Sequence, residues 1–415
     1  MREEVHLFII WENARNKQKE ILEDINSNFE IIKIYEMEWS KEKFSENLSR
    51  FYGTNLPNGS HKEKHCGTGK FVLIIVKDKK PIYEERMTSK GTQIVNINMF
   101  DKKEKYRELT GGGHKVHATN NETETNHDLT LLLGKNIEDY LKENSKKWNG
   151  KIEEKKQDLI GNNGWKNAKE MFYALNNCTK YAILRNYEVL PEEIYINEHN
   201  DIDLICESKE DVAYILNAEP VHKEEYRVQY KAKVENKIAY FDLRYIGDNY
   251  YDKKMEKNIL NNRVYNEKGF FTLNKENYFY SLLYHALIQK LDFSEDYRKR
   301  LIDMNIENIK ETASLEEFIN ILKKWMIANE YIMLKPNDES VIFNLNMVVY
   351  FEPLIYREND TSKLKAKIEE LQKENNEHKK IIKELIDKIN WIENSKTWKF
   401  TRPIRDIRKI FSRGK

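Results

Sequence analysis

Cysteine is scarce in this sequence of 415 residues, where Cys66, Cys178 and Cys206 lie far apart. Three scattered thiols are too few for a disulfide framework or for a zinc site made of thiolates. The chain also lacks any run of about 18 apolar residues, which argues against a transmembrane helix. Its first residues have neither the apolar core nor the small-residue cleavage site of a secretory signal. We therefore expect a cytoplasmic protein.

Neither sign of charge is in excess, because 70 Lys and Arg stand against 69 Asp and Glu. This balance argues against a surface built for nucleic acid, and no nucleic-acid partner is expected. Apolar residues make up 40% of the chain and charged residues 33%, as in packed domains with a charged surface. At roughly 150 residues per domain, the length predicts two or three domains.

Strand and helix patterns alternate along the chain and predict an α/β (α+β) fold. Residues 1–145 are expected to form an α/β sandwich domain, with a polar loop at 53–69. The charged, Gly/Asn-rich segment Lys146–Gly164 is expected to be a linker. A second α/β domain is predicted over 165–304, followed by a mixed accessory region over 305–357.

Residues 361–394 carry a heptad pattern, with seam positions at alternating spacings of four and three. Such a pattern predicts a coiled coil that joins two copies in a homodimer. A polar residue on the seam, Asn375, would fix the register of a parallel pair. The alternative is one amphipathic helix packed on the body. The seam comprises Leu364, Ile368, Leu371, Asn375, His378, Ile382, Leu385, Ile389 and Ile392.

The last segment, residues 395–415, combines basic with aromatic and aliphatic side chains. Such a tail favours peripheral binding to an anionic inner leaflet, and the alternative is a solvated tail. The stretch Ser395-Lys-Thr-Trp-Lys-Phe-Thr-Arg-Pro-Ile-Arg405 is similar to the C-terminal sequence of many bacterial glycosyltransferases and other enzymes of O-antigen and capsule assembly.

Three carboxylates on apolar strands are the strongest candidates for chemistry. Asp201 and Asp203 are two residues apart, which places both on one face of a strand, and Asp242 lies on a later strand. Such a set can hold Mg²⁺ (or Mn²⁺), which neutralises charge on a transferring phosphoryl or nucleotidyl group. The alternatives are a turn with a surface strand edge, and for Asp242 a surface pair with Arg244.

This arrangement resembles the nucleotidyltransferase superfamily with the polymerase-beta-type fold, whose signature is an Asp-x-Asp and a third Asp on a later strand. Asp201, Asp203 and Asp242 match it one by one. The resemblance implies a nucleotide substrate and catalytic, metal-binding roles for these residues. Leu184-Arg185-Asn186 stands where the superfamily has a Gly-Ser pair, so Arg185 and Asn186 are the candidates for holding phosphate.

The context of this motif, Tyr181–Glu188 before Asn200–Leu204, looks like nucleotidyltransferase-like proteins of bacterial surface-polysaccharide loci. The resemblance implies a metal-dependent nucleotidyl- or phosphotransferase in capsule, O-antigen or teichoic-type biosynthesis. Its substrates would be a nucleotide or nucleotide-linked donor and a glycan acceptor. Two rival functions are a non-catalytic coiled-coil adaptor of a polysaccharide assembly complex and a nucleotidyltransferase-type toxin or antitoxin.

The segment Thr110–Asn120 is rich in glycine and histidine. Amide groups of Gly112 and Gly113 could cradle an anion, and His114 and His117 could act at a phosphate site or bind a transition metal. A glycine turn with hydrogen-bonded histidines is the structural alternative.

The stretch Gly112–Asn120 resembles the active site of nucleoside diphosphate kinases. The resemblance implies that His117 takes the phosphoryl group and that Asp128 is the acidic residue of the next helix. Elsewhere, His285 lies on an apolar helix, where a hydrogen-bonded core role is more common than catalysis.

Overall fold

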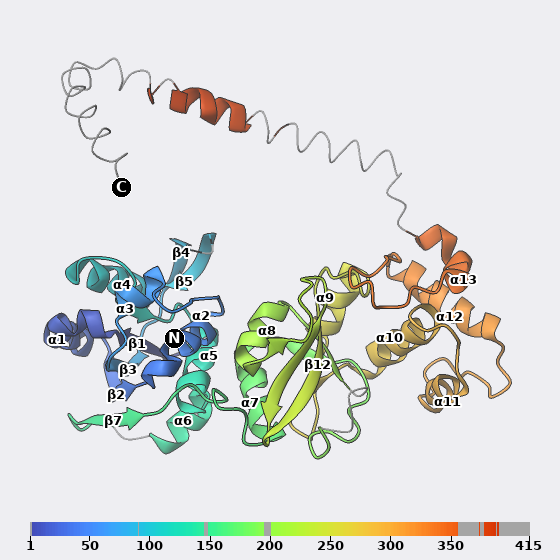
Figure 1. The fold of residues 1–415 in the computed structure, drawn as a ribbon, viewed down its shortest axis with the longest axis horizontal. Helices are drawn as coiled ribbons and strands as arrows, with labels where there is room; N and C mark the ends of the chain where they lie inside the picture. Colours follow the sequence, from blue (N-terminus) through green and yellow to red (C-terminus); the bar gives the residue numbers. More distant parts are fainter. Residues whose placement is uncertain are drawn as a thin grey trace, which may run out of the picture. The chain divides into compact units, whose positions relative to one another are not determined.

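The computed structural model describes residues 2–89, 91–144, 148–194 and 201–355, together with Lys373, 377–386 and 388–389. Helices and strands alternate through two main sheets, which confirms the expected α/β class (Figure 1). The described residues up to Ile355 belong to one compact unit.

The first sheet has the strand order β6-β1-β3-β2-β7. The first four of these are antiparallel to their neighbours, and β7 is parallel to β2. The order of the first four strands is the split βαβ arrangement called ferredoxin-like, which occurs with many unrelated functions. The strands are β1 (Glu4–Ile10), β2 (Glu30–Glu38), β3 (Phe71–Asp78), β6 (Val116–Ala118) and β7 (Ile152–Lys156).

Helices cover both faces of this sheet because its inner strands are apolar on both sides. In β1, Leu7 and Ile9 pack on one face, whereas Phe8 and Ile10 pack on the other. Each fully buried side chain of this size contributes about 1.5–3 kcal/mol. One face carries η1 (Glu12–Lys17), α1 (Gln18–Asn28) and α4 (Ile97–Leu109), and the other α2 (Phe44–Tyr52), α5 (Glu122–Leu133) and α6 (Ile137–Glu143).

Two predictions for this part of the chain are wrong. The expected linker contains β7, whose backbone extends the first sheet, because an exposed and charged edge strand has the composition of a connection. The expected polar loop contains α3 (His61–Cys66), in which the Ser60 hydroxyl accepts a hydrogen bond from the Glu63 amide. A helix of six residues is too short to display an apolar period.

A separate hairpin joins β4 (Tyr83–Thr88) to β5 (Gly91–Asn96), and η2 (Lys41–Lys43) precedes α2.

The second sheet has seven strands in the order β10-β11-β12-β9-β8-β14-β13. Strand β9 is parallel to β12 and antiparallel to β8. Helices α7 (Ala168–Cys178) and α8 (Lys209–Leu216) pack against one face of the sheet. The strands are β8 (Tyr181–Ile183), β9 (Ile202–Cys206), β10 (Glu219–Pro220), β11 (Gln229–Val234), β12 (Lys237–Tyr245), β13 (Val264–Tyr265) and β14 (Phe271–Thr272).

A helical core covers the other face of the second sheet. Leu184 and Ile205 from the sheet share this core with the almost fully buried helix α10 (Lys275–Ile288). The accessory region therefore packs around α10 and belongs to the same unit as the sheet. The other helices are α9 (Lys253–Asn261), α11 (Glu295–Asp303), α12 (Leu315–Ala328), α13 (Leu345–Val348) and η3 (Val349–Leu354).

One buried arginine joins the two sheet-bearing parts. Arg50 of α2 is 1% exposed and donates hydrogen bonds of 3.0 Å to the carbonyl oxygens of Tyr214 and Ile215. These carbonyls lie at the C-terminal end of α8, where the helix dipole favours a cation.

The described part of the predicted coiled coil is helical over 377–386. His378, Ile382, Leu385 and Ile389 are exposed to solvent in the chain as it stands alone. The other seam positions and the tail 395–415 lie outside the described residues, so the dimer and the membrane contact stay predictions. Among the residues that can be described, no helix is both long and apolar enough to cross a membrane.

Candidate functional site

The parallel pairing of β9 and β12 brings two of the predicted carboxylates together. Asp203 lies directly opposite Asp242 in the register of the two strands, where neighbouring strands are about 4.8 Å apart. Both side chains are largely buried, at 15% and 21% exposure. Asp201 lies just before β9, and its Oδ2 accepts a hydrogen bond of 2.6 Å from Gln229.

Each carboxylate of this pair faces an arginine. Arg185, directly after β8 and Leu184, lies with one guanidinium nitrogen 3.0 Å from Asp203 Oδ1 and 2.8 Å from the Tyr250 hydroxyl. Arg244 lies two residues after Asp242 on the same strand, 3.3 Å from its Oδ2. The alternative of an Asp242–Arg244 surface pair is wrong in one respect, because Arg244 is only 4% exposed.

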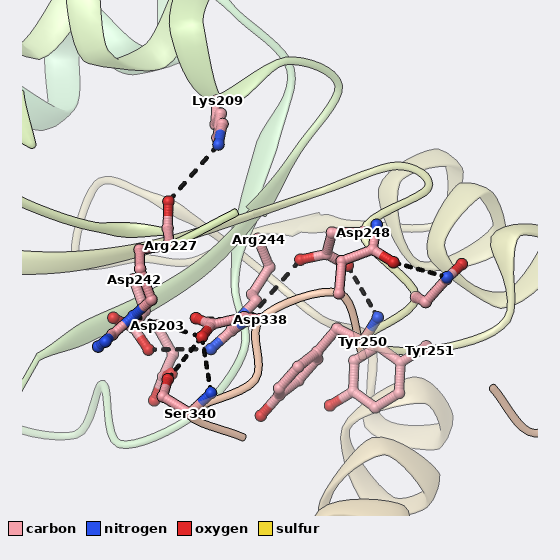
Figure 2. Close-up of polar contacts among 12 residues, drawn as sticks. Asp203, Lys209, Arg227, Asp242, Arg244, Asp248, Tyr250, Tyr251, Asp338 and Ser340 are labelled. Atoms are coloured by element: carbon pink, nitrogen blue, oxygen red, sulfur yellow. Dashed lines mark hydrogen bonds and ion pairs between the residues drawn. The ribbon is translucent and has the colours of Figure 1, made fainter. Parts of the chain in front are cut away.

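A loop far along the chain completes this network. Asp338 is 3% exposed and lies 3.5 Å from Arg244 and 3.3 Å from Arg227 (Figure 2). The backbone amide and hydroxyl of Ser340 also donate to Asp338. No sequence pattern pointed to Asp338, because it lies in an irregular segment and reaches the site only through the tertiary fold.

The two paired aspartates and their arginines line one cavity of about 530 Å³, whereas Asp338 and Arg227 lie behind its wall. Its wall holds the predicted residues Arg185, Asn186, Asp201, Asp203 and Asp242, so the structure brings together every site residue predicted for the second domain. The wall is mixed in charge, and further lining residues include Glu188, Glu193, Arg244, Tyr250, His285, Gln289, Lys290 and Tyr297.

The neighbouring carboxylates affect the ionisation of Asp242. The pKa of Asp242 is raised to about 6, first by burial and then by the nearby negative charges of Asp203 and Asp201, against the opposite effect of Arg244. An acid with such a pKa is mostly ionised at neutral pH and can accept a proton there, as a general base must.

His285 has the core role that its apolar helix indicated. Its Nδ1 lies 3.2 Å from the Tyr250 hydroxyl and 3.0 Å from Gln289 Oε1. Burial, followed by the charge of Arg185, holds its pKa well below the usual range, so the ring is neutral at physiological pH. It supports Tyr250, which in turn contacts Arg185.

The carboxylate oxygens of Asp201, Asp203 and Asp242 suit a hard cation such as Mg²⁺ in their chemistry but not in their spacing. Carboxylate oxygens are the ligands that Mg²⁺ prefers, and the repulsion felt by Asp242 would be relieved by a cation. However, Asp201, Asp203 and Asp242 are not among the described groups whose ligand atoms all lie within 4.8 Å of one another. A metal ion would therefore need the arginine-bound carboxylates to turn toward it.

The two histidines of the glycine and histidine segment have different surroundings: His117 lies beside Asp128, and His114 lies beside α3. His117 on β6 is 7% exposed, lies against the rings of Phe51 and Tyr52, and is 2.8 Å from Asp128. Asp128 also lies 2.9 Å from His127, and these contacts lower its pKa against the effect of burial. His117 is therefore enclosed by protein groups on several sides.

The glycine amides are mostly used within the fold. Gly112 donates 2.7 Å to the carbonyl of Arg107, and Gly111 donates 3.0 Å to that of Glu108. These bonds close the end of α4, so two of the three amides are not directed at an anion. His114 turns instead toward α3, where its ring lies near those of His61 and His65.

Comparisons with protein-family models and with curated proteins gave no match to this chain.

Proposed function

We propose that the chain is a metal-dependent nucleotidyl- or phosphotransferase whose site is the cavity at Asp203 and Asp242. The observation that carries the proposal is the in-register pairing of these two aspartates on parallel strands, at a cavity that Arg185 also lines. An Asp-x-Asp at the start of one strand and a third aspartate on its neighbour is the arrangement that the superfamily resemblance implies, with Asp201 just before β9 and Asp203 within it.

The residues then take distinct roles. Asp201 and Asp203 are the ligands for Mg²⁺ or Mn²⁺, an ion that supplies charge neutralisation on a phosphate when bound. Asp242 completes the ligand set or accepts a proton from the attacking group, for which its pKa of about 6 is suited. Arg185 and Asn186 line the cavity, and the proposal gives them the role of holding the phosphate.

Binding of a metal-bound nucleotide would exchange the partners of the arginines. Asp203 and Asp242 would leave Arg185 and Arg244 for the cation, and the phosphate oxygens would replace the carboxylates beside the arginines. The number of ion pairs would stay the same, so no buried charge would be left without a partner. Lys290, which also lines the cavity, adds positive charge for the phosphates.

The biological setting of the proposal rests on the sequence resemblances. The motif around Asp201 and Asp203 and the tail motif both favour bacterial cell-surface polysaccharide biosynthesis at the inner leaflet. The donor would be a nucleotide or nucleotide-linked compound, and the acceptor would be a glycan.

Calorimetry on the full chain tests the proposal. Nucleoside triphosphates are titrated into the parent with Mg²⁺ and with EDTA, and then into Asp242→Asn and Asp203→Asn. We expect Mg²⁺-dependent binding that each variant weakens at least tenfold. Asp296→Asn is the matched control, because that exposed carboxylate lies outside the cavity. Equal binding by the parent and both site variants would refute the assignment.

The arginine pairs favour a second candidate, the non-catalytic adaptor. If the contacts of Asp203 with Arg185 and of Asp242 with Arg244 are permanent, they form a structural network with no ligand role. An adaptor predicts no nucleotide binding by the parent at any Mg²⁺ concentration. The same titration therefore separates the two candidates.

A further inference from the structure

Three histidines gather in the first domain, away from the residues of the proposed transferase site. His61 and His65 are four residues apart on α3, which places them on one side of the helix. Their ring centroids are 4.0 Å apart, and the His114 ring is 5.5 Å from that of His65. The nitrogen atoms that these three side chains offer all lie within 4.8 Å of one another.

The backbone of the glycine segment is shaped to bring His114 to this place. Gly113 has φ +81°, and a Cβ at this position would lie 2.5 Å from Nδ1 of His65. Glycine is therefore required both for the left-handed conformation and for the close approach. The carbonyl of His114 also lies 3.5 Å from the Cys66 thiol, which links the segment to the end of α3.

The imidazoles are suited to bind a metal ion rather than a proton. The pKa of His114 is lowered to about 4, first by burial and then by the positive charges of Lys62 and Arg107. Burial also lowers the pKa of His65, followed by the charges of His61 and Lys115. Both rings are neutral at physiological pH, and neutral imidazole is the form that ligates metal.

We propose that His61, His65 and His114 form a binding site for a divalent transition-metal ion of the zinc type. Three imidazoles bind the ion and a water molecule fills the fourth position, which is accessible because His61 is exposed. In a tetrahedral zinc site the nitrogen ligands are about 3.4 Å apart, so small rotations of the three side chains suffice. The ion pins α3 to the glycine segment. This inference is independent of the transferase proposal.

Two features of the surroundings affect how tightly the three histidines can bind an ion. The His114 amide donates to Nδ1 of His65 at 3.2 Å, and an ion bound through that ring alters this hydrogen bond. The nearby cations are engaged elsewhere, since Lys115 donates to the Thr110 carbonyl and Lys62 lies on the Tyr52 ring.

The second histidine cluster is a weaker candidate. His117, Glu124 and Asp128 also offer ligand atoms within 4.8 Å of one another. However, Asp128 already bonds both His117 and His127, and Glu124 accepts from the Asn120 amide. This cluster is a closed hydrogen-bond network, whereas the His61 cluster has a solvent-facing member.

Competition with a chromophoric zinc chelator tests the proposal on the full, EDTA-treated chain. We expect one equivalent of Zn²⁺ per chain, and Co²⁺ in its place should give the visible absorption of a tetrahedral site. Replacing His65 or His61 by Ala should weaken binding by at least about 100-fold, beyond the loss typical of an outer-shell change. His378→Ala is the matched control, because this exposed histidine lies on the C-terminal helical segment.

Further variants distinguish loss of the metal ligands from loss of the fold. The metal-free melting temperature of His61→Ala should equal that of the parent, because His61 is exposed. Gly113→Ala should weaken Zn²⁺ binding with all three ligands present, since its Cβ displaces the His65 ring. Equal Zn²⁺ affinity in the parent and the histidine variants would overturn the proposal, as would loss of binding only in Asp128→Asn. Stabilisation by inorganic phosphate without metal, abolished by His65→Ala, would also overturn it in favour of an anion site.

Discussion

The Arg185 guanidinium lies 3.0 Å from the Asp203 carboxylate, and both side chains are largely removed from solvent. Arg185 follows Leu184 directly after β8. Asp203, the aspartate of β9, therefore has a protein cation beside its carboxylate. This pair makes Asp203 a structural group as well as a candidate ligand.

We predict that Asp203→Asn lowers the free energy of unfolding by about 3 kcal/mol, because it leaves the buried Arg185 without that carboxylate. Asp242→Asn is the matched change on the neighbouring strand. It should alter stability by less than about 1 kcal/mol, since it also removes the repulsion between the two aspartates and Arg244 keeps Asp338 nearby. Urea denaturation at pH 7.5 measures both. Equal losses in the two variants would contradict this account of the network.

The pH dependence of stability should reveal Asp242. Its pKa rises from an ordinary 3.8 to about 6 in the folded protein, so the folded state holds a proton that the unfolded state has lost. This contribution to stability is complete below pH 3.8 and is lost as the pH rises through 6. We expect a decrease on the order of 2 kcal/mol over that window, present in the parent and absent from Asp242→Asn.

Cation binding should show the reverse trend, because a proton and Mg²⁺ compete for Asp242. The Mg²⁺ affinity of the parent should rise between pH 5 and 7 and then level off. Parallel pH profiles for the parent and Asp242→Asn, in either stability or Mg²⁺ affinity, would show that Asp242 is not the titrating group.

The local parts of the site could be predicted from sequence, but their assembly could not. An apolar strand interrupted by Asp203, and another interrupted by Asp242, are visible as local patterns. Their pairing in register depends on the order of strands in the sheet, which no local pattern specifies. Asp338 comes from an irregular segment nearly a hundred residues later, so nothing in its neighbours marks it.

Around the first sheet, too, some elements could be predicted from local sequence patterns and others could not. Its strands β1 and β3 contain apolar runs and β2 has an alternating pattern, whereas α3 is too short for a period and β7 is too polar. The glycine segment is unusual in sequence, but the amides of Gly111 and Gly112 close α4 instead of facing a ligand. His114 lies near His61 and His65 only because the fold brings a distant helix beside it.

A buried carboxylate between two histidines should matter for stability. Asp128 has a pKa below its ordinary value, so its contribution is present above about pH 3.9 and is lost as the pH falls through the folded value. We predict that Asp128→Asn destabilises the chain at pH 7 by about 1–3 kcal/mol, because a charge-assisted bond to His117 is lost. Thermal unfolding followed by circular dichroism measures this. A variant as stable as the parent would show that the contact carries no net energy.

The junction between the two sheet-bearing parts should depend on Arg50. Replacement by Met keeps an apolar stem of similar length but removes both hydrogen bonds to the end of α8. We expect a loss of about 2 kcal/mol, as for hydrogen bonds from a charged donor. Arg15→Met is a matched control, since that arginine is partly exposed and bonds Glu36 within the first domain. Equal effects of the two changes in urea denaturation would contradict a special role for the junction.

The described helical residues 377–386 and 388–389 allow a test of the predicted dimer. Ile382 and Leu385 occupy seam positions of the heptad pattern, and each is about half exposed in the single chain. Since a seam buries such side chains against a second helix, we expect the parent to be dimeric at tens of micromolar and Leu385→Glu to be monomeric. Lys383→Glu is the matched control, because that position faces away from the seam and tolerates either charge. Light scattering after size exclusion measures the mass of each. A monomeric parent would refute the dimer and leave the alternative of one amphipathic helix packed on the body, in which case Leu385→Glu should lower stability without changing mass.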